Sequence, residues 1–314
     1  MVKKVDVSAA VITRPDGSFL LGQRAEGTFY PGYWEFPGGK VEAGETPRDA
    51  LVRELAEELS VEVREAWPWL MREHHYEHAH VRLHFFEVPV WEGEPRAHVH
   101  ADLRWQHAGA FTVSPMLPAN GPILKALSLP RQMALTHAGE IGVDAQLAAL
   151  DRALAAGLRW VQVREPLLDA ATRRSFAAAV LARCRAAGAL AVLNGSADEA
   201  RELGMDGVHL SAAALAALES RPELEWVGAS CHARAELERA NALALDYAVL
   251  GAIKPTPTHP GQAALGWEQF HALTRELSLP VIAIGGLCSD DLIEARQAGA
   301  HGIACIRAAW GETA

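Results

Sequence analysis

The densest set of side chains able to do chemistry lies in the segment 38–61, where Glu54, Glu57 and Glu58 fall within five residues. At about 100° per residue, Glu54 and Glu58 are separated by roughly 40° around a helix, and Glu57 lies roughly 60° from Glu54. Like charges crowded on one flank oppose helix formation, which favours a bound cation there. Mg²⁺ is the expected ion, with Mn²⁺ as a substitute, because Mg²⁺ prefers a few carboxylates together with phosphate oxygens and water.

A helix from residue 46 to residue 59 is expected to carry these carboxylates. Thr46 can cap its start, Pro47 suits the first helical position, and Asp49 at the third position nearly completes a capping box. A leucine stripe for burial is formed by Leu51, Leu55 and Leu59. An acidic run alone is more often a solvated helix face, so the neighbouring residues decide the interpretation.

Those neighbours resemble the Nudix box, in which Gly, five residues, Glu, seven residues and Arg-Glu-apolar-x-Glu-Glu-x-Gly-apolar follow one another. The matching positions are Gly39, Glu45, Arg53, Glu54, Leu55, Glu57, Glu58 and Val61. Ser60 departs from the pattern, since it stands near the helix end where Gly adopts a left-handed conformation at low cost. We expect this departure to have a small effect on stability and none on the chemistry.

The resemblance implies an α/β/α sandwich with a mixed sheet between helices. Glu54 and Glu58 would be direct metal ligands, the Gly38 carbonyl a further ligand, and Glu57 an assisting group. Arg53 would hold Glu45 or a neighbouring carboxylate in place. The implied reaction is metal-dependent hydrolysis of a diphosphate bond, because a bound divalent ion neutralises phosphate charge and lowers the pKa of water.

Three further stretches, 34–40, 91–95 and 117–123, resemble the MutT branch of the Nudix family, which hydrolyses 8-oxo-dGTP to the monophosphate and pyrophosphate. In that branch the Asn of a Pro-Ala-Asn motif hydrogen-bonds the oxidised base, so Asn120 is the implied base-recognition residue. An amide suits this role because it offers both donors and an acceptor. Phe36 and Arg24 are candidates for lining the nucleotide site, with packing or a surface position as the alternative.

One acidic position of that branch is missing. A further Glu usually follows the stretch 91–95, and Val99 occupies the matching place. His98, His100 or Asp102 are candidate substitutes, because His and Asp can act as a base or a metal ligand. Surface histidines are the alternative interpretation.

The second half of the chain alternates short apolar runs with helical segments such as 144–156 and 170–187. Eight such runs occur, at 133–136, 160–163, 190–193, 207–210, 226–228, 247–250, 281–284 and 302–305. Near-continuous apolar strands that alternate with helices are typical of a parallel sheet, and eight units predict a closed (β/α)₈ TIM barrel. An α/β chain of 314 residues is therefore expected to form two domains, 1–127 and 128–314, joined by a Pro-punctuated linker over 114–130.

Motifs lie at the expected strand ends, at 162–165, 192–194, 206–210, 228–232, 251–258 and 283–286. They resemble those of thiamine phosphate synthase and its thiazole-tautomerase relative. The resemblance implies that a phosphorylated thiazole would be bound by Arg164, Ser230, His232, Thr256, Thr258, Gly285 and Gly286. The synthase pattern is incomplete, however: Pro166 replaces a pyrophosphate-binding Lys, Gly195 replaces a magnesium-binding Asp, and the second magnesium Asp falls within Ser-Ala-Ala-Ala at 211–214. We predict that synthase activity is absent or very weak. A tautomerase-like role for His232 and a retained scaffold or regulatory pocket remain as alternatives.

The net charge, the length of the apolar runs and the cysteine distribution limit the classes of partner that the chain is expected to bind. A formal net charge of −10 and a pI near 5.8 argue against binding of nucleic acid polymers, so the expected substrate is a free nucleoside triphosphate. No apolar run approaches the roughly 20 residues that span a bilayer, and four scattered cysteines suggest reduced packing residues, so no membrane partner and a cytoplasmic location are expected. The alternative function is Nudix hydrolysis of a thiamine-pathway diphosphate, with the barrel binding or sensing a thiazole phosphate.

Overall fold

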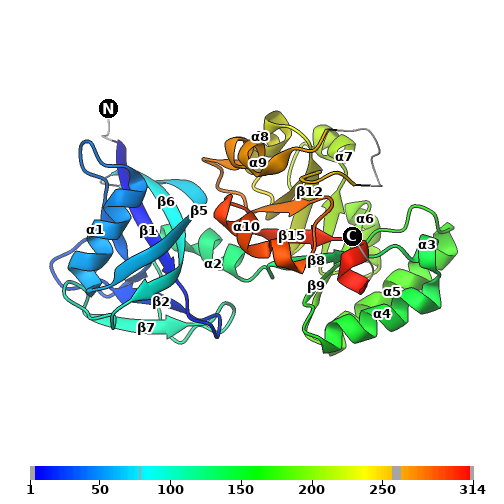
Figure 1. Ribbon diagram of the computed structural model, residues 1–314, viewed down its shortest axis with the longest axis horizontal. Helices are drawn as coiled ribbons and strands as arrows, with labels where there is room; N and C mark the ends of the chain where they lie inside the picture. The colour runs from blue at the N-terminus through cyan, green and yellow to red at the C-terminus, as the bar shows by residue number, and fades with distance from the viewer. Residues whose placement is uncertain (1–3, 78, 257–262, 312–314) are drawn as a thin grey trace. The chain divides into compact units, whose positions relative to one another are not determined.

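The computed structural model describes residues 4–77, 79–256 and 263–311. The chain divides into two compact units, residues 1–129 and 130–314 (Figure 1). Each unit has its own sheet system and its own hydrophobic core.

The first unit builds a larger mixed sheet and a smaller antiparallel one. The mixed sheet has the order β4 (Gly38–Lys40), β1 (Lys4–Ile12), β6 (His80–Glu92), β5 (Glu62–His75), with β1 and β6 parallel. The smaller sheet has the order β3 (Trp34–Glu35), β2 (Phe19–Gln23), β7 (Asp102–Gln106). The helical elements are α1 (Pro47–Leu59), the 3₁₀ turn η1 (Pro118–Asn120) and α2 (Gly121–Leu127).

Strand β1 separates two core layers, because successive side chains of a strand face opposite sides of its sheet. Ala9 lies in one cluster with Ile123 of α2. Its neighbour Ala10 lies in the other cluster with the fully buried leucine stripe of α1. Helices therefore cover both faces of the mixed sheet, which confirms the predicted α/β/α sandwich and fixes α1 against β1 and β4.

The turn residues Arg-Pro-Asp-Gly at 14–17 predict a β-hairpin between residues 5–13 and 18–23, and this prediction is wrong. β1 and β2 meet at a single described bridge, Thr13 to Phe19, and then enter different sheets. Both edges of β1 are already occupied, by β4 and by β6, so β2 has no free edge of β1 to pair with.

The expected linker over 114–130 is also wrong in extent. Ile123, Leu124 and Ala126 of α2 are buried in the first core, and the Trp34 N–H donates to the Pro115 carbonyl at 2.8 Å. The prolines in this segment therefore mark turns of a packed closing segment, and the division between the units falls between residues 129 and 130.

In the second unit, the described residues close a barrel of eight parallel strands, which confirms the predicted fold. The strands are β8 (Gln132–Leu135), β9 (Trp160–Val163), β10 (Leu190–Asn194), β11 (Gly207–Leu210), β12 (Trp226–Cys231), β13 (Tyr247–Gly251), β14 (Val281–Ile284) and β15 (Gly302–Cys305). Each pairs with its neighbours in sequence, and β15 pairs with β8 to close the ring.

Helices follow most of the barrel strands (Figure 1). They are α3 (Ala138–Ile141), α4 (Val143–Ala155), α5 (Ala170–Ala186), α6 (Ala197–Glu202), α7 (Ala212–Ala217), α8 (Arg234–Ala242), α9 (Gly266–Thr274) and α10 (Leu292–Gln297), with 3₁₀ turns η2 (Ser289–Asp291) and η3 (Arg307–Trp310). All four cysteines are free thiols, and three of them are buried. No helix within the described part of the chain is long and apolar enough to cross a bilayer.

Candidate functional site

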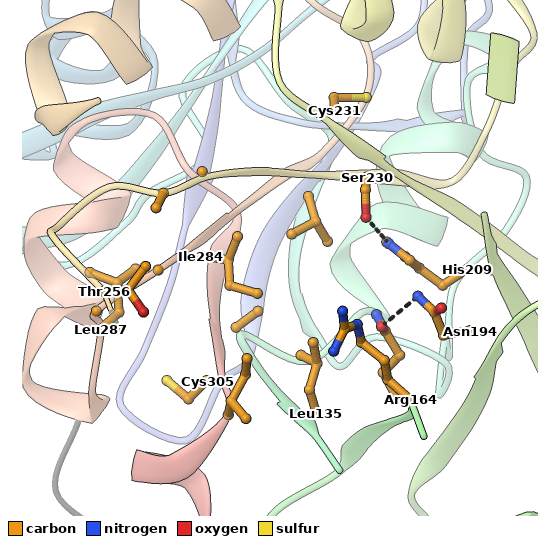
Figure 2. A pocket seen from close by; sticks show the side chains of 18 of the residues that line it. Leu135, Arg164, Asn194, His209, Ser230, Cys231, Thr256, Ile284, Leu287 and Cys305 are labelled. Carbon is orange, nitrogen blue, oxygen red and sulfur yellow. Dashed lines mark hydrogen bonds between the residues drawn. The ribbon is translucent and has the colours of Figure 1, made fainter. Parts of the chain in front are cut away.

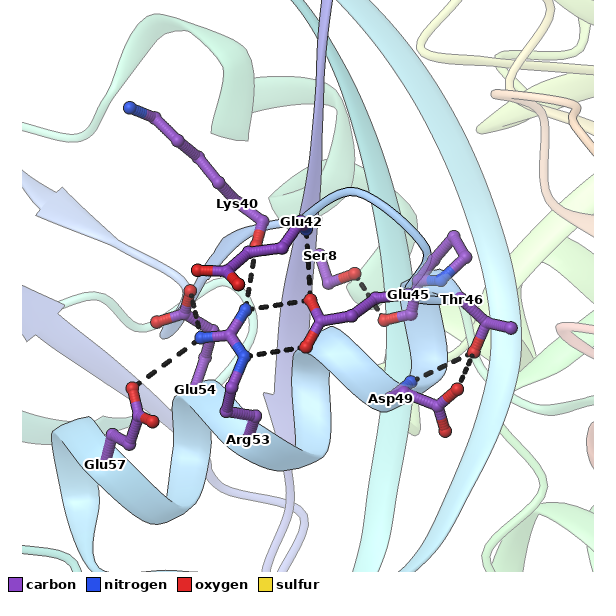
Figure 3. Close-up of polar contacts among 10 residues, drawn as sticks. Ser8, Lys40, Glu42, Glu45, Thr46, Asp49, Arg53, Glu54 and Glu57 are labelled. Carbon is purple, nitrogen blue, oxygen red and sulfur yellow. Dashed lines mark hydrogen bonds and ion pairs between the residues drawn. The ribbon is translucent and has the colours of Figure 1, made fainter.

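The capping residues of helix α1 explain where the helix begins and ends. The Thr46 hydroxyl accepts from the Asp49 N–H at 3.2 Å, and Pro47 takes the first helical position (Figure 3). At the other end Ser60 adopts the left-handed conformation, with φ 56° and ψ 35°. This is the backbone that a glycine takes at low cost, so the Ser60 departure places strain at a helix end rather than in the carboxylate flank.

Arg53 joins the acidic side chains of this region (Figure 3). Its Nε and Nη2 atoms donate to both carboxylate oxygens of Glu45, at 2.8 and 3.0 Å, and Nη2 also donates to the Lys40 carbonyl at 3.1 Å. Its Nη1 atom lies 3.0 Å from Glu54 and 3.6 Å from Glu57. Hydrogen bonds from Arg53 lower the pKa of Glu45 to about 2, so this carboxylate remains ionised and holds the guanidinium in place.

Two glycines of β4 allow close contacts that a side chain would block, Gly38 with β1 and Gly39 with Glu54. A side chain on Gly38 would place its Cβ 2.1 Å from the Ser8 carbonyl oxygen, and Gly38 has φ 145°. A Cβ on Gly39 would lie 2.1 Å from the carboxylate carbon of Glu54. Glycine at 39 is therefore needed for the Glu54 carboxylate to lie directly against β4, beside the residue whose carbonyl is the candidate ligand.

Glu58 is the buried member of the acidic set. Its Oε2 atom has no hydrogen-bond partner among the described residues. Burial raises the pKa of Glu58 to about 7, the charge of His100 opposes this shift, and Glu54 adds to it. An unpaired buried carboxylate oxygen is costly, which fits a group that a divalent ion would pair with.

The residues of this site fit an Mg²⁺ ion that is held by only a few protein groups. Among the described side chains, no group of three or more His, Cys, Asp or Glu is arranged to hold an ion. Mg²⁺ is commonly bound by one or two carboxylates, with waters and substrate phosphates completing its ligands. Glu54 and Glu58, together with the Gly38 carbonyl, are the groups that would hold it, whereas the Glu57 side chain is largely exposed.

A second polar group lies close to Glu58. Arg24 donates through Nη1 to Glu35 at 2.6 Å and through Nε to the Phe29 carbonyl at 2.6 Å. The other carboxylate oxygen of Glu35 lies 3.7 Å from Nε2 of His100. Both Arg24 and Glu35 contribute to the electrostatic surroundings of Glu58.

The three candidate substitutes for the missing Glu have different surroundings. His98 pairs with the Ser60 hydroxyl at 2.7 Å, at the surface. Asp102 pairs with Arg104 at 2.8 Å, and Val99 itself is exposed. Of the candidates, His100 is the one whose charge acts on Glu58.

Two candidate substrate-binding residues of the first unit, Asn120 and Phe36, have different surroundings. Asn120 is buried, and its Nδ2 donates to the Trp34 carbonyl at 3.2 Å. Phe36 packs in the core between Phe19 and Phe85, with ring centroids 5.8 and 5.5 Å away, so its ring belongs to the core rather than to the carboxylate site.

In the second unit a pocket of about 510 Å³ opens at the carboxyl ends of the barrel strands (Figure 2). Its polar lining side chains are Gln162, Arg164, Asn194, His209, Ser211, Ser230, His232, Thr256 and Arg307. No Asp or Glu belongs to this lining as far as the chain is described. The pocket is therefore cationic, and it offers an anion Arg and N–H donors but offers a metal ion no carboxylate.

The positions that depart from the synthase pattern explain this lining. Ser211 lines the pocket and caps α7 by accepting from the Ala214 N–H at 3.2 Å. Asn194 donates to Gln162 at 3.1 Å instead of standing beside an acidic neighbour, because residue 195 is Gly. Glu165 does not line the pocket. Its carboxylate accepts hydrogen bonds from the backbone N–H groups of Ala138 and Gly139 at the start of α3.

A buried hydrogen-bonded chain runs from the barrel interior to the pocket. His209 contacts Tyr247 through Nδ1 at 3.2 Å. Through Nε2 it contacts Ser230 at 2.9 Å (Figure 2). Burial lowers the pKa of His209 to about 3, with the charge of Arg164 adding to the effect, so the imidazole is neutral. Burial also raises the pKa of the Tyr247 phenol, so its O–H remains a donor.

The remaining barrel candidates surround the same pocket, with one exception. His232, Thr256, Gly285 and Gly286 all line it, and both glycines have positive φ, 104° and 65°. Thr258 lies outside the described residues. Except for Thr258, the candidate ligand residues thus meet at one cavity.

Comparison with known proteins assigns both units. A NUDIX domain model matches residues 3–127, and a thiamine monophosphate synthase model matches residues 133–309. The chain is 39% identical to a CTP pyrophosphohydrolase of Escherichia coli K12 over 125 residues, which are 40% of this chain and 92% of the relative. It is 31% identical to an 8-oxo-dGTP diphosphatase of the same organism over 126 residues, 40% of this chain and 98% of the relative.

The second unit has relatives of comparable similarity. The chain is 40% identical to a thiamine-phosphate synthase of Chromobacterium violaceum over 168 residues, which are 52% of this chain and 81% of the relative. The chain belongs to the Nudix and thiamine monophosphate synthase families. Its first unit is a Nudix hydrolase domain of the diphosphatase class, fused to a thiamine phosphate synthase-like barrel.

Sequence reasoning missed several polar residues of both family sites. Glu35 of the Nudix domain carries no sequence signal of its own, because its contacts are with Arg24 and His100, which lie on other segments. In the barrel, His209 was noted only within a strand motif. A polar residue inside an otherwise apolar strand was the available signal, since such a side chain must face the barrel interior and find a partner there.

Proposed function

We propose that the Nudix domain, residues 1–127, hydrolyses 8-oxo-dGTP to the monophosphate and pyrophosphate, which keeps the oxidised nucleotide out of DNA. The supporting observation is the buried Asn120 amide, held by the Trp34 carbonyl on β3. Trp34 precedes Glu35, which pairs with Arg24 near Glu58. Strand β3 therefore links a base-reading amide to the carboxylate flank of α1.

The roles of the residues follow from their contacts. Glu54 and Glu58, with the Gly38 carbonyl, would hold Mg²⁺, which would supply charge neutralisation on phosphate oxygens and activation of water. Arg53 restrains Glu54 and Glu57 while Glu45 restrains Arg53. Such preorganisation lowers the reorganisation needed when phosphate charge develops in the transition state.

Asn120 supplies the selectivity. An amide has two N–H donors and an acceptor oxygen, so its bond to Trp34 leaves further capacity to read a purine edge. A base that cannot match these groups leaves a buried polar atom unpaired, which costs about 1–3 kcal/mol.

A second candidate substrate is CTP. It is favoured by the higher identity to a CTP pyrophosphohydrolase, 39% against 31% for the 8-oxo-dGTP diphosphatase. Hydrolysis of the same bond in CTP would use the same carboxylates, so the two candidates differ in recognition of the base and of the sugar 2′-position.

The test compares kcat/KM with Mg²⁺ for 8-oxo-dGTP, dGTP, CTP and thiamine diphosphate, in wild type and Asn120→Ala. We expect 8-oxo-dGTP to be preferred, and Asn120→Ala to reduce its advantage over dGTP by about 10- to 100-fold. Preference for CTP, with selectivity untouched by Asn120→Ala, would replace the oxidised-guanine assignment. Preference for thiamine diphosphate would place the Nudix domain in the pathway of its barrel.

For the barrel, residues 128–314, we propose binding of a thiamine-pathway phosphate without synthase activity. The support is a cationic pocket that contains Arg164 and lacks carboxylates in its described lining. Titration calorimetry with a thiazole phosphate should show binding that Arg164→Ala weakens and that needs no Mg²⁺. Binding that appears only with Mg²⁺ would contradict this proposal.

A further inference from the structure

Three neighbouring strands of the barrel place His209, Gly228 and Tyr247 in one row. His209 of β11 pairs with Gly228 of β12, and Gly228 pairs with Tyr247 of β13. A Cβ at position 228 would lie 2.1 Å from the Tyr247 ring, so glycine is needed for the two rings to meet across β12. Their centroids are 5.6 Å apart. The register of the barrel thus brings a phenol and an imidazole together in its interior.

Ser230 joins this row to the pocket. It follows Gly228 by two residues, so both face the same side of β12, and Ser230 is nearer the carboxyl end of the strand. Its Oγ atom lies 2.9 Å from Nε2 of His209 (Figure 2), whereas Nδ1 of His209 lies 3.2 Å from the Tyr247 hydroxyl. Both ring nitrogens of His209 therefore have a partner, one buried in the barrel and the other lining the pocket.

The buried partner decides which ring nitrogen carries hydrogen. Burial lowers the pKa of His209 to about 3, so the imidazole is neutral and has one donor and one acceptor nitrogen. Tyr247 is fully buried, and among the described residues Nδ1 of His209 is the one hydrogen-bond partner of its hydroxyl. A hydrogen on Nδ1 would leave the phenol O–H without an acceptor, which costs free energy in the interior. Tyr247 therefore donates to Nδ1, and the imidazole hydrogen lies on Nε2.

This tautomer sets the hydrogen-bonding role of Ser230. Because Nε2–H donates to Oγ of Ser230, the hydrogen of the hydroxyl is not used by His209. A hydroxyl has a single O–H donor, which is here left for an acceptor in the pocket. The opposite tautomer would direct that hydrogen to Nε2 and would leave Ser230 as an acceptor only. Tyr247 does not itself line the pocket, yet it determines how a lining residue can bind.

We infer that Tyr247 is a positioning residue, which keeps the hydrogen of His209 on Nε2 so that the Ser230 hydroxyl donates to an anionic oxygen of the pocket ligand. An anionic acceptor is favoured because Arg164 lines the same pocket and its described lining holds no Asp or Glu. This inference rests on the proposed function of the barrel, because it assumes that a phosphate ester binds there.

The first test records the ring nitrogens of His209 by ¹⁵N NMR on the full chain labelled at histidine. A nitrogen that carries hydrogen resonates at a much lower chemical shift than one that does not, and His209→Gln identifies the signals by their loss. We expect the hydrogen on Nε2 in the wild type. Tyr247→Phe keeps the ring and removes the donor, so part of the molecules should carry the hydrogen on Nδ1.

Trp160→Phe is the matched control for this measurement. Trp160 packs edge-on against Tyr247 with 4.8 Å between the ring centroids, so the variant disturbs the same part of the core and retains the hydroxyl. It should leave the His209 tautomer unchanged. Gly228→Ala should alter the tautomer, because its Cβ would displace the Tyr247 ring.

The second test measures binding of a thiazole phosphate by titration calorimetry. Ser230→Ala should weaken binding by about tenfold, the effect of one hydrogen bond to an anionic oxygen. Tyr247→Phe should weaken it by about three- to tenfold. The double variant Tyr247→Phe/Ser230→Ala should bind no more weakly than Ser230→Ala, because Tyr247 acts through the serine. Thermal melts identify any variant that has lost its fold, and the wild-type tautomer remains an independent test.

The outcomes separate this inference from the proposed function. A hydrogen on Nδ1 in the wild type, or an unchanged tautomer in Tyr247→Phe, would overturn the role of Tyr247 while phosphate binding stands. Multiplicative losses in the double variant would mean that Tyr247 does not act through Ser230. If the wild type binds no thiazole phosphate, the proposed function of the barrel fails, and with it the role of Ser230, whereas the NMR result on Tyr247 still holds.

Discussion

The flank of α1 and the pocket of the barrel show two ways in which a family site can persist. In α1 and the loop before it every charged residue of the Nudix pattern is present, and Arg53 contacts three of the carboxylates. In the barrel the cavity and most candidate ligand residues persist, yet residues 166, 195 and 211–214 carry Pro, Gly and Ser-Ala-Ala-Ala where the synthase pattern has charged groups.

This difference shows that the shape of a pocket and the chemistry within it depend on different residues. A barrel pocket is maintained by packing of many apolar residues, so it survives the loss of a few polar ones. Metal-dependent phosphate chemistry relies on the few charged groups that hold the metal, so it does not survive their replacement. The fold of the barrel alone is therefore no evidence for an activity, whereas the charged network of α1 supports one.

The largest expected effect concerns the location of metal binding. Glu54→Gln/Glu58→Gln should abolish specific Mn²⁺ binding by the full chain, because the described lining of the barrel pocket has no carboxylate. Arg164→Ala, a change in the barrel, should leave Mn²⁺ binding intact. A full equivalent of tightly bound Mn²⁺ remaining in the double variant would show that the chain binds the metal away from the α1 carboxylates.

Gly39→Ala should lower kcat/KM by about 100-fold, because the added Cβ would lie 2.1 Å from the Glu54 carboxylate carbon and displace it by about 1 Å. The free energy of unfolding should change little, since the φ of Gly39 is not in the left-handed region. Kinetics and denaturant unfolding on the same samples check both parts. Equal activity of the variant and wild type would show that Glu54 does not need this position.

The eight barrel strands were predictable because each is buried on both faces and is therefore a short apolar run. β5 (Glu62–His75) was not predicted, although it is the longest strand of the Nudix domain. It carries charged residues and Pro68, and its pairing with β6 shifts register between Val63 and Leu70, which disrupts the alternation that identifies a strand.

The carboxylate flank was predictable for a similar reason, since residues four apart on a helix always share a face. Glu35, His100 and the Tyr247–His209–Ser230 chain were not, because their contacts join segments that are distant in the sequence. Sequence spacing gives no measure of such contacts between elements.

The pH dependence of barrel stability gives a smaller effect. His209 has a folded pKa of about 3, below its unfolded value near 6.5, so its contribution is complete above pH 6.5 and is lost as pH falls toward 3. Between pH 7 and pH 5 the barrel should lose about 2 kcal/mol from this group.

Hydrogen exchange of barrel peptides across this range measures the loss, with His209→Gln as the variant that cannot protonate. The wild type should lose protection between pH 7 and pH 5 more steeply than His209→Gln. The same slope in both proteins would mean that His209 is not held neutral by burial.

The smallest effect is expected at the helix end. Ser60→Gly relieves a left-handed residue, worth about 1 kcal/mol, and loses the exposed hydrogen bond to His98. The two changes oppose each other, so Tm should rise by about 2 °C or less, with kcat/KM unchanged. A large drop in activity would place Ser60 in the site rather than at its border.

The most direct test of the account is identification of the products of 8-oxo-dGTP in the presence of Mg²⁺, for wild type and Glu54→Gln. The account predicts the monophosphate and pyrophosphate from wild type and a loss of turnover of at least about 100-fold in Glu54→Gln. Release of orthophosphate, or turnover that survives Glu54→Gln, would contradict the assignment of the hydrolysis to the carboxylates of α1.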